Sequence, residues 1–172
     1  FVNAGAEIVA ASEEFDLSFA ESIPRPWFSS RILPDISDPA YQVMMGSQLF
    51  NLGRFAEARV FLERAFALDA ASEETAASLA RVYLAVEDPA AAARILAAFV
   101  DPAKTPEYET LVLAAEARKR TKDFEPAVGL LERAVAHFGI NAVLMNSLGE
   151  CYEGLGKTPE ALAAYEKSLQ LS

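Results

Sequence analysis

The feature that most constrains this chain is an internal repeat with a period of 34 or 35 residues. The segment Leu52–Ala58 returns as Leu155–Ala161, and two more diverged copies lie between them. The closing alanines of the four copies mark the period: Ala58, Ala92, Ala127 and Ala161. Repeats of this length fold as supersecondary units that bury their apolar faces against their neighbours. The sequence therefore predicts a solenoid of four stacked units.

Each unit is predicted to be a pair of helices, because helix-start signals recur and apolar residues between them follow helical spacing. An acceptor side chain precedes proline at Asp38-Pro39, Asp88-Pro89, Thr105-Pro106 and Thr158-Pro159. The expected helices cover residues 39–52, 55–68, 73–86, 89–100, 106–121, 124–138, 141–154 and 158–171. Small residues one period apart allow the two helices of a pair to approach closely: Gly46, Ala80, Ala115 and Gly149.

These positions resemble the tetratricopeptide repeat. The fourth copy carries the family's pattern best, at Leu148-Gly149, Tyr152, Gly156, Ala161 and Tyr165, and the third is the most diverged. The resemblance implies an all-α, right-handed superhelical solenoid of four helix-turn-helix repeats, with boundaries at 39–72, 73–107, 108–141 and 142–172.

Residues 1–38 differ in kind and are predicted to be an extended or β-like segment with a proline-rich linker. Phe15, Leu17 and Phe19 alternate with polar residues as in a strand, although a helix through Ile8–Phe15 is the competing prediction. The segment resembles the end of a β-sandwich domain of some secreted bacterial proteins. Alternatively, it folds back on the solenoid or pairs with its copy in a homodimer, because a lone hairpin is marginal in water.

Composition excludes several classes of partner. The formal net charge of -10 disfavours nucleic acid, which requires a dense positive surface. The one basic run, Arg118–Lys122, ends a predicted helix, where cations are favourable without any ligand. The longest nearly apolar stretch, Ala90–Val100, is too short for a membrane span, so no membrane insertion is expected.

No residue pattern points to catalysis, a cofactor or a metal, and the chain is predicted not to be an enzyme. His137 is the sole histidine and has no second ligand or base in prospect. Cys151 takes the place of a small buried residue. The segment Gly154–Thr158 ends like a phosphate-binding loop, but a repeat helix precedes it where that motif needs a strand.

The resemblance implies a function in binding proteins or peptides. In the family, the first helices of successive repeats line a concave groove that receives a peptide or a helix of a partner. The corresponding positions are Val43, Met44, Ser47, Phe50, Asn51, Ala77, Ser78, Arg81, Leu84, Glu109, Val112, Glu116, Lys119, Arg120, Asn146, Glu150 and Glu153. Family members that clamp the carboxylate at the end of a chaperone need cations and asparagines where Val43, Ser47 and Glu109 stand, so we expect no such clamp.

The alternative hypothesis is a structural or oligomerisation spacer within a larger bacterial protein whose activity lies in flanking domains. The last helix is then expected to expose Leu162, Tyr165 and Leu169, and to serve, like the first segment, as a contact for a homodimer. A soluble protein is expected, and the likeness of its first segment to secreted bacterial proteins favours an extracytoplasmic location.

Overall fold

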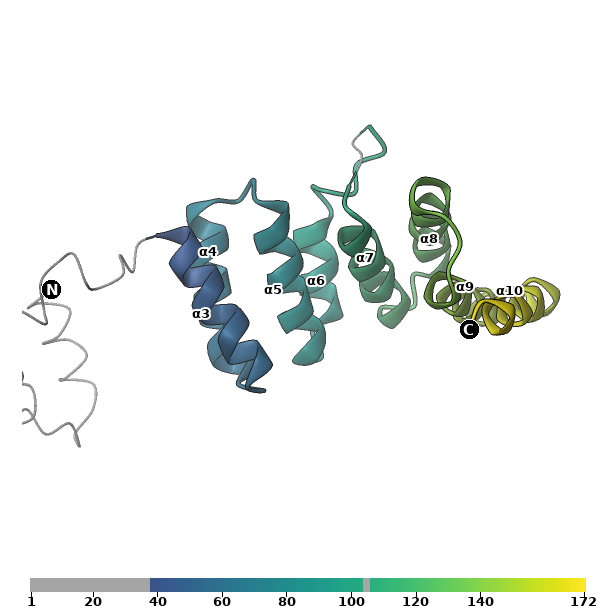
Figure 1. Ribbon diagram of the computed structural model, residues 1–172, viewed down its shortest axis with the longest axis horizontal. Helices are drawn as coiled ribbons and strands as arrows, with labels where there is room; N and C mark the ends of the chain where they lie inside the picture. The colour runs from purple at the N-terminus through teal and green to yellow at the C-terminus, as the bar shows by residue number, and fades with distance from the viewer. Residues whose placement is uncertain (1–37, 104–105) are drawn as a thin grey trace, which may run out of the picture. The chain divides into compact units, whose positions relative to one another are not determined.

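The computed structural model describes residues 38–103 and 106–172. The predictions for the strand, the linker and their docking or dimerisation concern residues 1–37 and lie outside this range. Within the described residues there are eight α-helices and no strand (Figure 1). With the labels of Figure 1 they are α3 (Pro39–Asn51), α4 (Phe55–Leu68), α5 (Glu73–Ala85), α6 (Pro89–Leu96), α7 (Tyr108–Arg120), α8 (Phe124–Phe138), α9 (Ala142–Gly154) and α10 (Thr158–Leu171). The predicted all-α solenoid is thus confirmed for this part of the chain.

Capping side chains fix several of the helix starts. Asp38 accepts a hydrogen bond from the amide of Ala40 at 2.9 Å, and Asp88 accepts one from Ala91 at 3.0 Å. Ser72 and Asn141 cap α5 and α9 in the same way. These bonds satisfy amides that the first helical turn leaves without a partner.

One predicted helix start and one predicted N-cap are wrong. The helix expected from Pro106 begins at Tyr108, with Glu107 at the N-cap. Thr158 is not the cap of α10 but its first helical residue, which follows Lys157 at the N-cap. In both places no side chain caps the helix.

The helix predicted over residues 89–100 is shorter and ends at Leu96. After it the carbonyl of Leu96 accepts bonds from the amides of Phe99 and Val100 at 3.0 and 3.2 Å. Pro102, which cannot continue a helix, follows shortly afterwards. The carbonyls of Val100 and Asp101 accept bonds from the guanidinium of Arg133, at 2.6 and 3.3 Å. Hydrogen bonds from Arg133 therefore hold the segment after α6 against α8.

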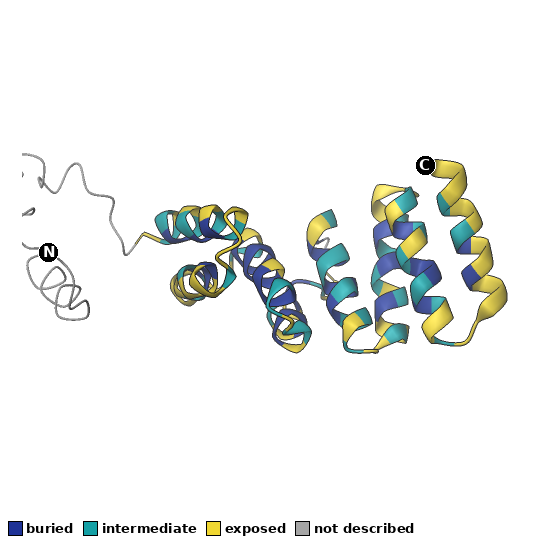
Figure 2. Ribbon diagram, turned by 90° about the horizontal axis from the view of Figure 1, so that it is seen from below, coloured by how far each residue is buried: buried dark blue, intermediate teal, exposed yellow. Residues whose placement is uncertain are grey.

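Small residues let the two helices of a pair approach closely, as predicted. A Cβ atom on Gly46 would lie 2.5 Å from Cγ of Leu62, and one on Gly149 would lie 2.5 Å from the ring of Tyr165. Ala80 and Ala115 occupy the equivalent positions of the second and third repeats, and both are buried. The buried side chains form two clusters, one in each half of the solenoid, and Val100 and Leu130 pack against both. Buried and exposed residues alternate along most of the described helices, and much of α10 is exposed (Figure 2).

Each described helix contacts the next one along the chain. In addition, the backbone of α3 approaches that of α5, α5 approaches α7, and α7 approaches α9, whereas the backbones of the second helices of successive pairs do not approach one another as closely. A stack that is close on one side and open on the other is curved, with the first helices on the inner side. No helix among the described residues has the length and apolar character needed to cross a membrane.

Candidate peptide-binding groove

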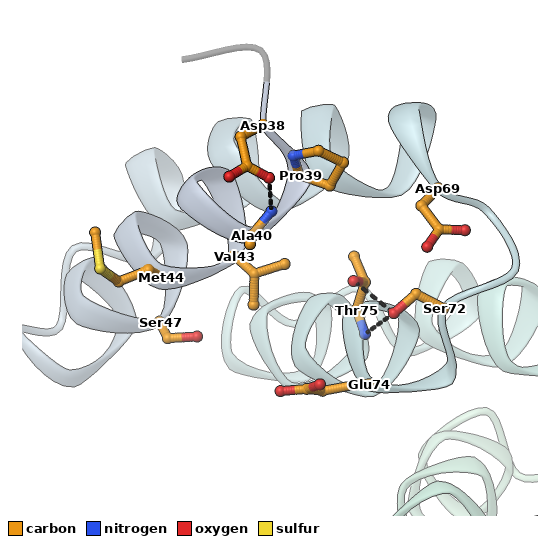
Figure 3. Close-up of a pocket in the computed structure, with 10 residues that line it drawn as sticks. All are labelled: Asp38, Pro39, Ala40, Val43, Met44, Ser47, Asp69, Ser72, Glu74 and Thr75. Carbon is orange, nitrogen blue, oxygen red and sulfur yellow. Dashed lines mark hydrogen bonds between the residues drawn. The ribbon is translucent and has the colours of Figure 1, made fainter. Parts of the chain in front are cut away.

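The inner layer formed by α3, α5, α7 and α9 carries the residues predicted to line the groove. Two pockets in this layer lie between α3 and α5. The larger hollow, called here the large pocket, has a volume of about 600 Å³ (Figure 3). Its lining residues are Asp38, Pro39, Ala40, Val43, Met44, Ser47, Asp69, Ser72, Glu74 and Thr75. Three predicted residues, Val43, Met44 and Ser47, therefore lie together in one pocket.

The small pocket lies next to it and shares Ser47. Its volume is about 100 Å³, and it is lined by Ser47, Phe50, Asn51, Leu62, Ser78 and Arg81. Five of these six residues belong to the predicted groove. The structure thus brings together the predicted residues of the first repeat with two residues of the second.

Helix α5 offers less surface than the sequence suggested. Ala77, Ser78 and Leu84 are buried, and Leu84 belongs to the first core cluster. Arg81 alone of the four predicted residues on this helix is exposed, and its Nε lies 3.2 Å from Oε1 of Glu109 on α7. Neighbouring helices cover α5 from both sides, so most of its predicted groove face is part of the packing.

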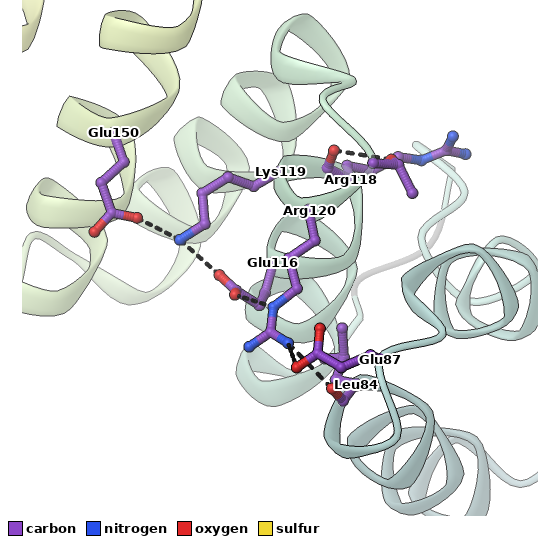
Figure 4. A network of polar contacts seen from close by, with 8 residues as sticks. Leu84, Glu87, Glu116, Arg118, Lys119, Arg120 and Glu150 are labelled. Carbon is purple, nitrogen blue, oxygen red and sulfur yellow. Dashed lines mark hydrogen bonds and ion pairs between the residues drawn. The ribbon is translucent and has the colours of Figure 1, made fainter.

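Charged residues on α7 are tied to one another and to both neighbouring helices (Figure 4). Oε2 and Oε1 of Glu116 accept bonds from Lys119 Nζ at 2.6 Å and Arg120 Nε at 2.7 Å. Lys119 also contacts Glu150 on α9. On the other side, Arg120 donates to the carbonyl of Leu84 at 3.1 Å. The predicted groove charges Glu116, Lys119, Arg120 and Glu150 therefore join three helices of the inner layer.

Burial and hydrogen bonding shift the pKa values of this network in opposite directions. Burial raises the pKa of Glu116, but the bonds from Lys119 and Arg120 outweigh it, and the pKa lies below its ordinary value. For Lys119, burial lowers the pKa, and the bonds to Glu116 and Glu150 reverse this and leave it raised. Both side chains are therefore ionised and paired at neutral pH.

The remaining predicted residues lie at the far end of the inner layer. Asn146 donates to Glu150 at 2.7 Å, and Glu153 accepts a 2.9 Å bond from the hydroxyl of Tyr165. Val112 is half-buried against the second core cluster. Neither the large pocket nor the small pocket includes any of these three residues.

Sequence reasoning missed the acidic rim of the large pocket. Asp38 precedes α3, Glu74 lies in the first turn of α5, and Asp69 lies at the end of α4. A signal for the first two was present: successive first helices run in the same direction, so their starts meet at one edge of the layer. No periodic signal marked Asp69, which lies in the connection between repeats.

Other residues considered for chemistry have structural surroundings. Cys151 is fully buried, and burial raises the pKa of its thiol to about 11, so it is protonated at neutral pH and unreactive. His137 is exposed near the end of α8. Arg118 pairs with Asp123 at 3.2 Å, so three of the five residues in the basic run make ion pairs. The described residues contain no cluster of three His, Cys, Asp or Glu side chains placed to hold a metal.

Taken together, the paired helices, the small-residue contacts and the inner layer define a helical-repeat protein of the solenoid class. Two family models, both described as tetratricopeptide repeat, match residues 49–115 and 142–172. The repeats of this chain are tetratricopeptide repeats, and the chain is in general terms a scaffold for protein interactions.

Solved structures agree with this fold. A crystal structure of MamA has a TM-score of 0.68 at 25% sequence identity, and the match covers 74% of each chain. TTC0263, a thermophilic tetratricopeptide repeat protein of Thermus thermophilus, has a TM-score of 0.65 at 24% identity, covering 78% of this chain and 75% of that one. MamA from residue 41 onward of Desulfovibrio magneticus RS-1 has a TM-score of 0.71 at 20% identity, covering 78% and 76%. None of the curated proteins compared with the chain matches it.

Proposed function

We propose that the inner layer of α3, α5, α7 and α9 receives a peptide or a helix of a partner protein, and that binding is centred on the two pockets between α3 and α5. The observation that carries the proposal is the asymmetry of the stack: the backbones of successive first helices approach one another, whereas those of successive second helices stay further apart. A curved layer of this kind presents a continuous surface to an extended or helical ligand.

The first half of the layer suits this role better than the second. Met44 is 48% exposed and lies beside the half-buried Val43, and methionine adapts its shape to different apolar ligands. In the second half, Glu116, Lys119 and Glu150 are already paired with one another. A ligand that competed for these charges would have to break bonds that hold the helices together.

Selection from a random displayed peptide library against the full chain tests this proposal. Selected peptides are then titrated by fluorescence anisotropy against the full chain and two variants that each add a glutamine side chain. Ser47 lines both pockets, so Ser47→Gln adds bulk to each of them. Ala67→Gln adds a similar side chain at an exposed position of α4. We expect Ser47→Gln to weaken binding at least tenfold and Ala67→Gln to leave it unchanged. Equal affinity for all three proteins would contradict groove binding.

A second candidate function is assembly or spacing, and exposed apolar side chains in the fourth repeat favour it. Leu162 and Leu169 of α10 are 57% and 77% exposed, as the sequence predicted. Tyr165, predicted to be exposed with them, is half-buried because its ring lies over Gly149. Light scattering of the full chain and of a Leu162→Glu, Leu169→Glu variant tests this role. A larger mass in the parent that falls in the variant supports assembly through α10, and equal masses contradict it.

A further inference from the structure

The large pocket combines three carboxylates with apolar side chains. Asp38, Asp69 and Glu74 are among its ten lining residues, and none of the ten is basic. Val43 and Met44 provide apolar surface from α3 (Figure 3). An inference about the ligand of this pocket rests on the proposed groove function and adds the chemistry of the partner.

The balance of charge at the pocket is negative. Two helices begin there, and each N-terminus contributes about half a positive charge. Backbone amides already meet part of the charge on each side: Asp38 accepts from the amide of Ala40, Ser72 accepts from the amide of Thr75, and Asp69 accepts from the amide of Ala71. None of the ion pairs among the described residues involves Asp38, Asp69 or Glu74. Three carboxylates against two partial charges leave an excess of negative charge.

The arrangement distinguishes between kinds of cation. Among the described residues, no three acidic side chains converge as metal ligands do. The three carboxylates are instead contributed by three different elements, with Val43 and Met44 beside them. A bare metal ion needs several oxygens at bonding distance, whereas an ammonium or guanidinium group on an apolar stem can use separate carboxylates and an apolar wall.

The nature of the pocket also excludes anionic ligands. A carboxylate or phosphate placed here would face three like charges, and desolvating it beside them would oppose binding. This agrees with the expectation that the chain does not clamp the terminal carboxylate of a chaperone.

We propose that the large pocket recognises a partner segment in which arginine or lysine adjoins a bulky apolar residue. The cation lies at the acidic rim to which Asp69 and Glu74 contribute from opposite sides (Figure 3), and the apolar side chain rests on Val43 and Met44. A volume of about 600 Å³ accommodates the side chains of a few residues. Complementary charge then selects the partner and its register, and the apolar contact supplies much of the affinity.

The test uses peptides selected from the displayed library against the full chain. Their sequences are compared with the unselected library for enrichment of Arg or Lys next to Leu, Ile, Met or Phe. One selected peptide is then synthesised in three forms that differ only by Arg, Gln or Glu at the cationic position. Each form is titrated by fluorescence anisotropy against the full chain and against Asp69→Asn, Glu74→Gln and Glu166→Gln. Glu166 is an exposed residue of α10 without an ion pair in the described structure, so its variant controls for net charge.

We expect the Arg form to bind more tightly than the Gln form, and the Gln form more tightly than the Glu form. Asp69→Asn and Glu74→Gln should each weaken the Arg form roughly two- to fivefold, the range for partly exposed charge pairs. Both variants should leave the Gln form unchanged, and Glu166→Gln should affect neither. Raising the salt from about 50 to about 300 mM should reduce the advantage of the Arg form.

Three results would overturn the inference, and they separate it from the groove proposal. If the three forms bind equally but Ser47→Gln still weakens them, the groove is retained and the cationic preference is rejected. If no peptide is enriched, or if Ser47→Gln has no effect on those that are, both proposals fail. Equal losses in Glu74→Gln and Glu166→Gln would also reject the pocket as the source of the preference.

Discussion

The hydroxyl of Tyr83 donates a 2.8 Å hydrogen bond to Oε1 of Glu63, which joins the first helix of the second repeat to the second helix of the first. Tyr152 donates a 3.1 Å bond to Glu132 between the third and fourth repeats. In both pairs the tyrosine lies 20 residues after the glutamate. The bond is therefore a recurring feature of the junction between repeats, and one junction between described repeats lacks it.

Removing the hydroxyl of Tyr83 should loosen the first junction. Tyr83→Phe is expected to lower the free energy of unfolding by about 1 kcal/mol, the usual net value of one such bond. A double-mutant cycle with Glu63→Gln in guanidinium denaturation isolates the coupling between the two side chains. Tyr41→Phe is the control, because no hydrogen bond of that hydroxyl occurs among the described residues. A similar loss in the control would show that the hydroxyl bond is not responsible.

The coupling should also depend on pH. Burial and the bond to Glu63 raise the pKa of Tyr83 to about 12, so the stability from the neutral hydroxyl is complete below about pH 10 and is lost as the pH rises through 12. Burial raises the pKa of Glu63, but the bonds from Arg59 and Tyr83 outweigh it and leave the pKa lowered. Its contribution is present above its ordinary pKa of 4.5 and is lost as the pH falls through the lowered value.

The sequence predicted the helical architecture well, because it depends on local signals. The 34-residue period and the helical spacing of apolar residues located helices such as α4, α8 and α10 at their observed residues. The small residues Gly46 and Gly149 were correctly linked to close helix packing. These inferences depend on sequence patterns and on packing within one helix pair, not on how one repeat contacts the next.

The groove was harder to predict, because its surface depends on how far one repeat covers the next. Ala77, Ser78 and Leu84 fall on the inner face of α5 by their spacing, yet neighbouring helices bury them. The pairing of Lys119 with Glu150 likewise joins two repeats. Sequence period assigns a residue to a face of a helix, but the angle between repeats decides whether that face meets solvent.

A backbone feature recurs in the turn inside each repeat. Gly53, Glu87, Lys122 and Gly156 all have positive φ angles, of 74°, 59°, 64° and 71°. These positions are equivalent by the repeat period, and only two of them carry glycine. For other residues this conformation costs about 1 kcal/mol.

Lys122→Gly should therefore stabilise the protein by about 0.5–1 kcal/mol, since it relieves strain in a turn. Thermal and guanidinium unfolding both report the change. Lys167→Gly is the matched control, because it places the same substitution inside α10, where glycine costs about 1 kcal/mol. Destabilisation by both substitutions would mean that the turn is not strained.

Close packing in the fourth repeat gives a further prediction. Gly149→Ala places a methyl group 2.5 Å from the ring of Tyr165, and that ring is also held by the hydroxyl bond to Glu153. We expect a loss of about 1–3 kcal/mol from overpacking. Gly129→Ala on α8 has open space around the new methyl group and should instead stabilise by about 0.5–1 kcal/mol. Stabilisation by both would show that α9 and α10 separate without cost.

The ion pairs of α7 should contribute to stability in a pH-dependent way. Glu116 is 28% exposed and Lys119 20%, so solvent screens their contact less than a surface pair. Glu116→Gln should reduce the free energy of unfolding by about 1–2 kcal/mol at neutral pH, because two charged hydrogen bonds are weakened.

The pKa of Glu116 is lowered in the folded protein, so its contribution is complete above about pH 5 and is lost as the pH falls through the lowered value. The difference between the parent and Glu116→Gln should accordingly shrink as the solution is acidified from about pH 6 to about pH 3. Glu166→Gln, which removes an exposed carboxylate without an ion pair in the described structure, should change stability little at any of these values. A difference at Glu116 that stays constant with pH would mean that the carboxylate acts through its shape and not its charge. A difference that shrinks identically for Glu166 would assign the effect to net charge, since each variant removes one negative charge.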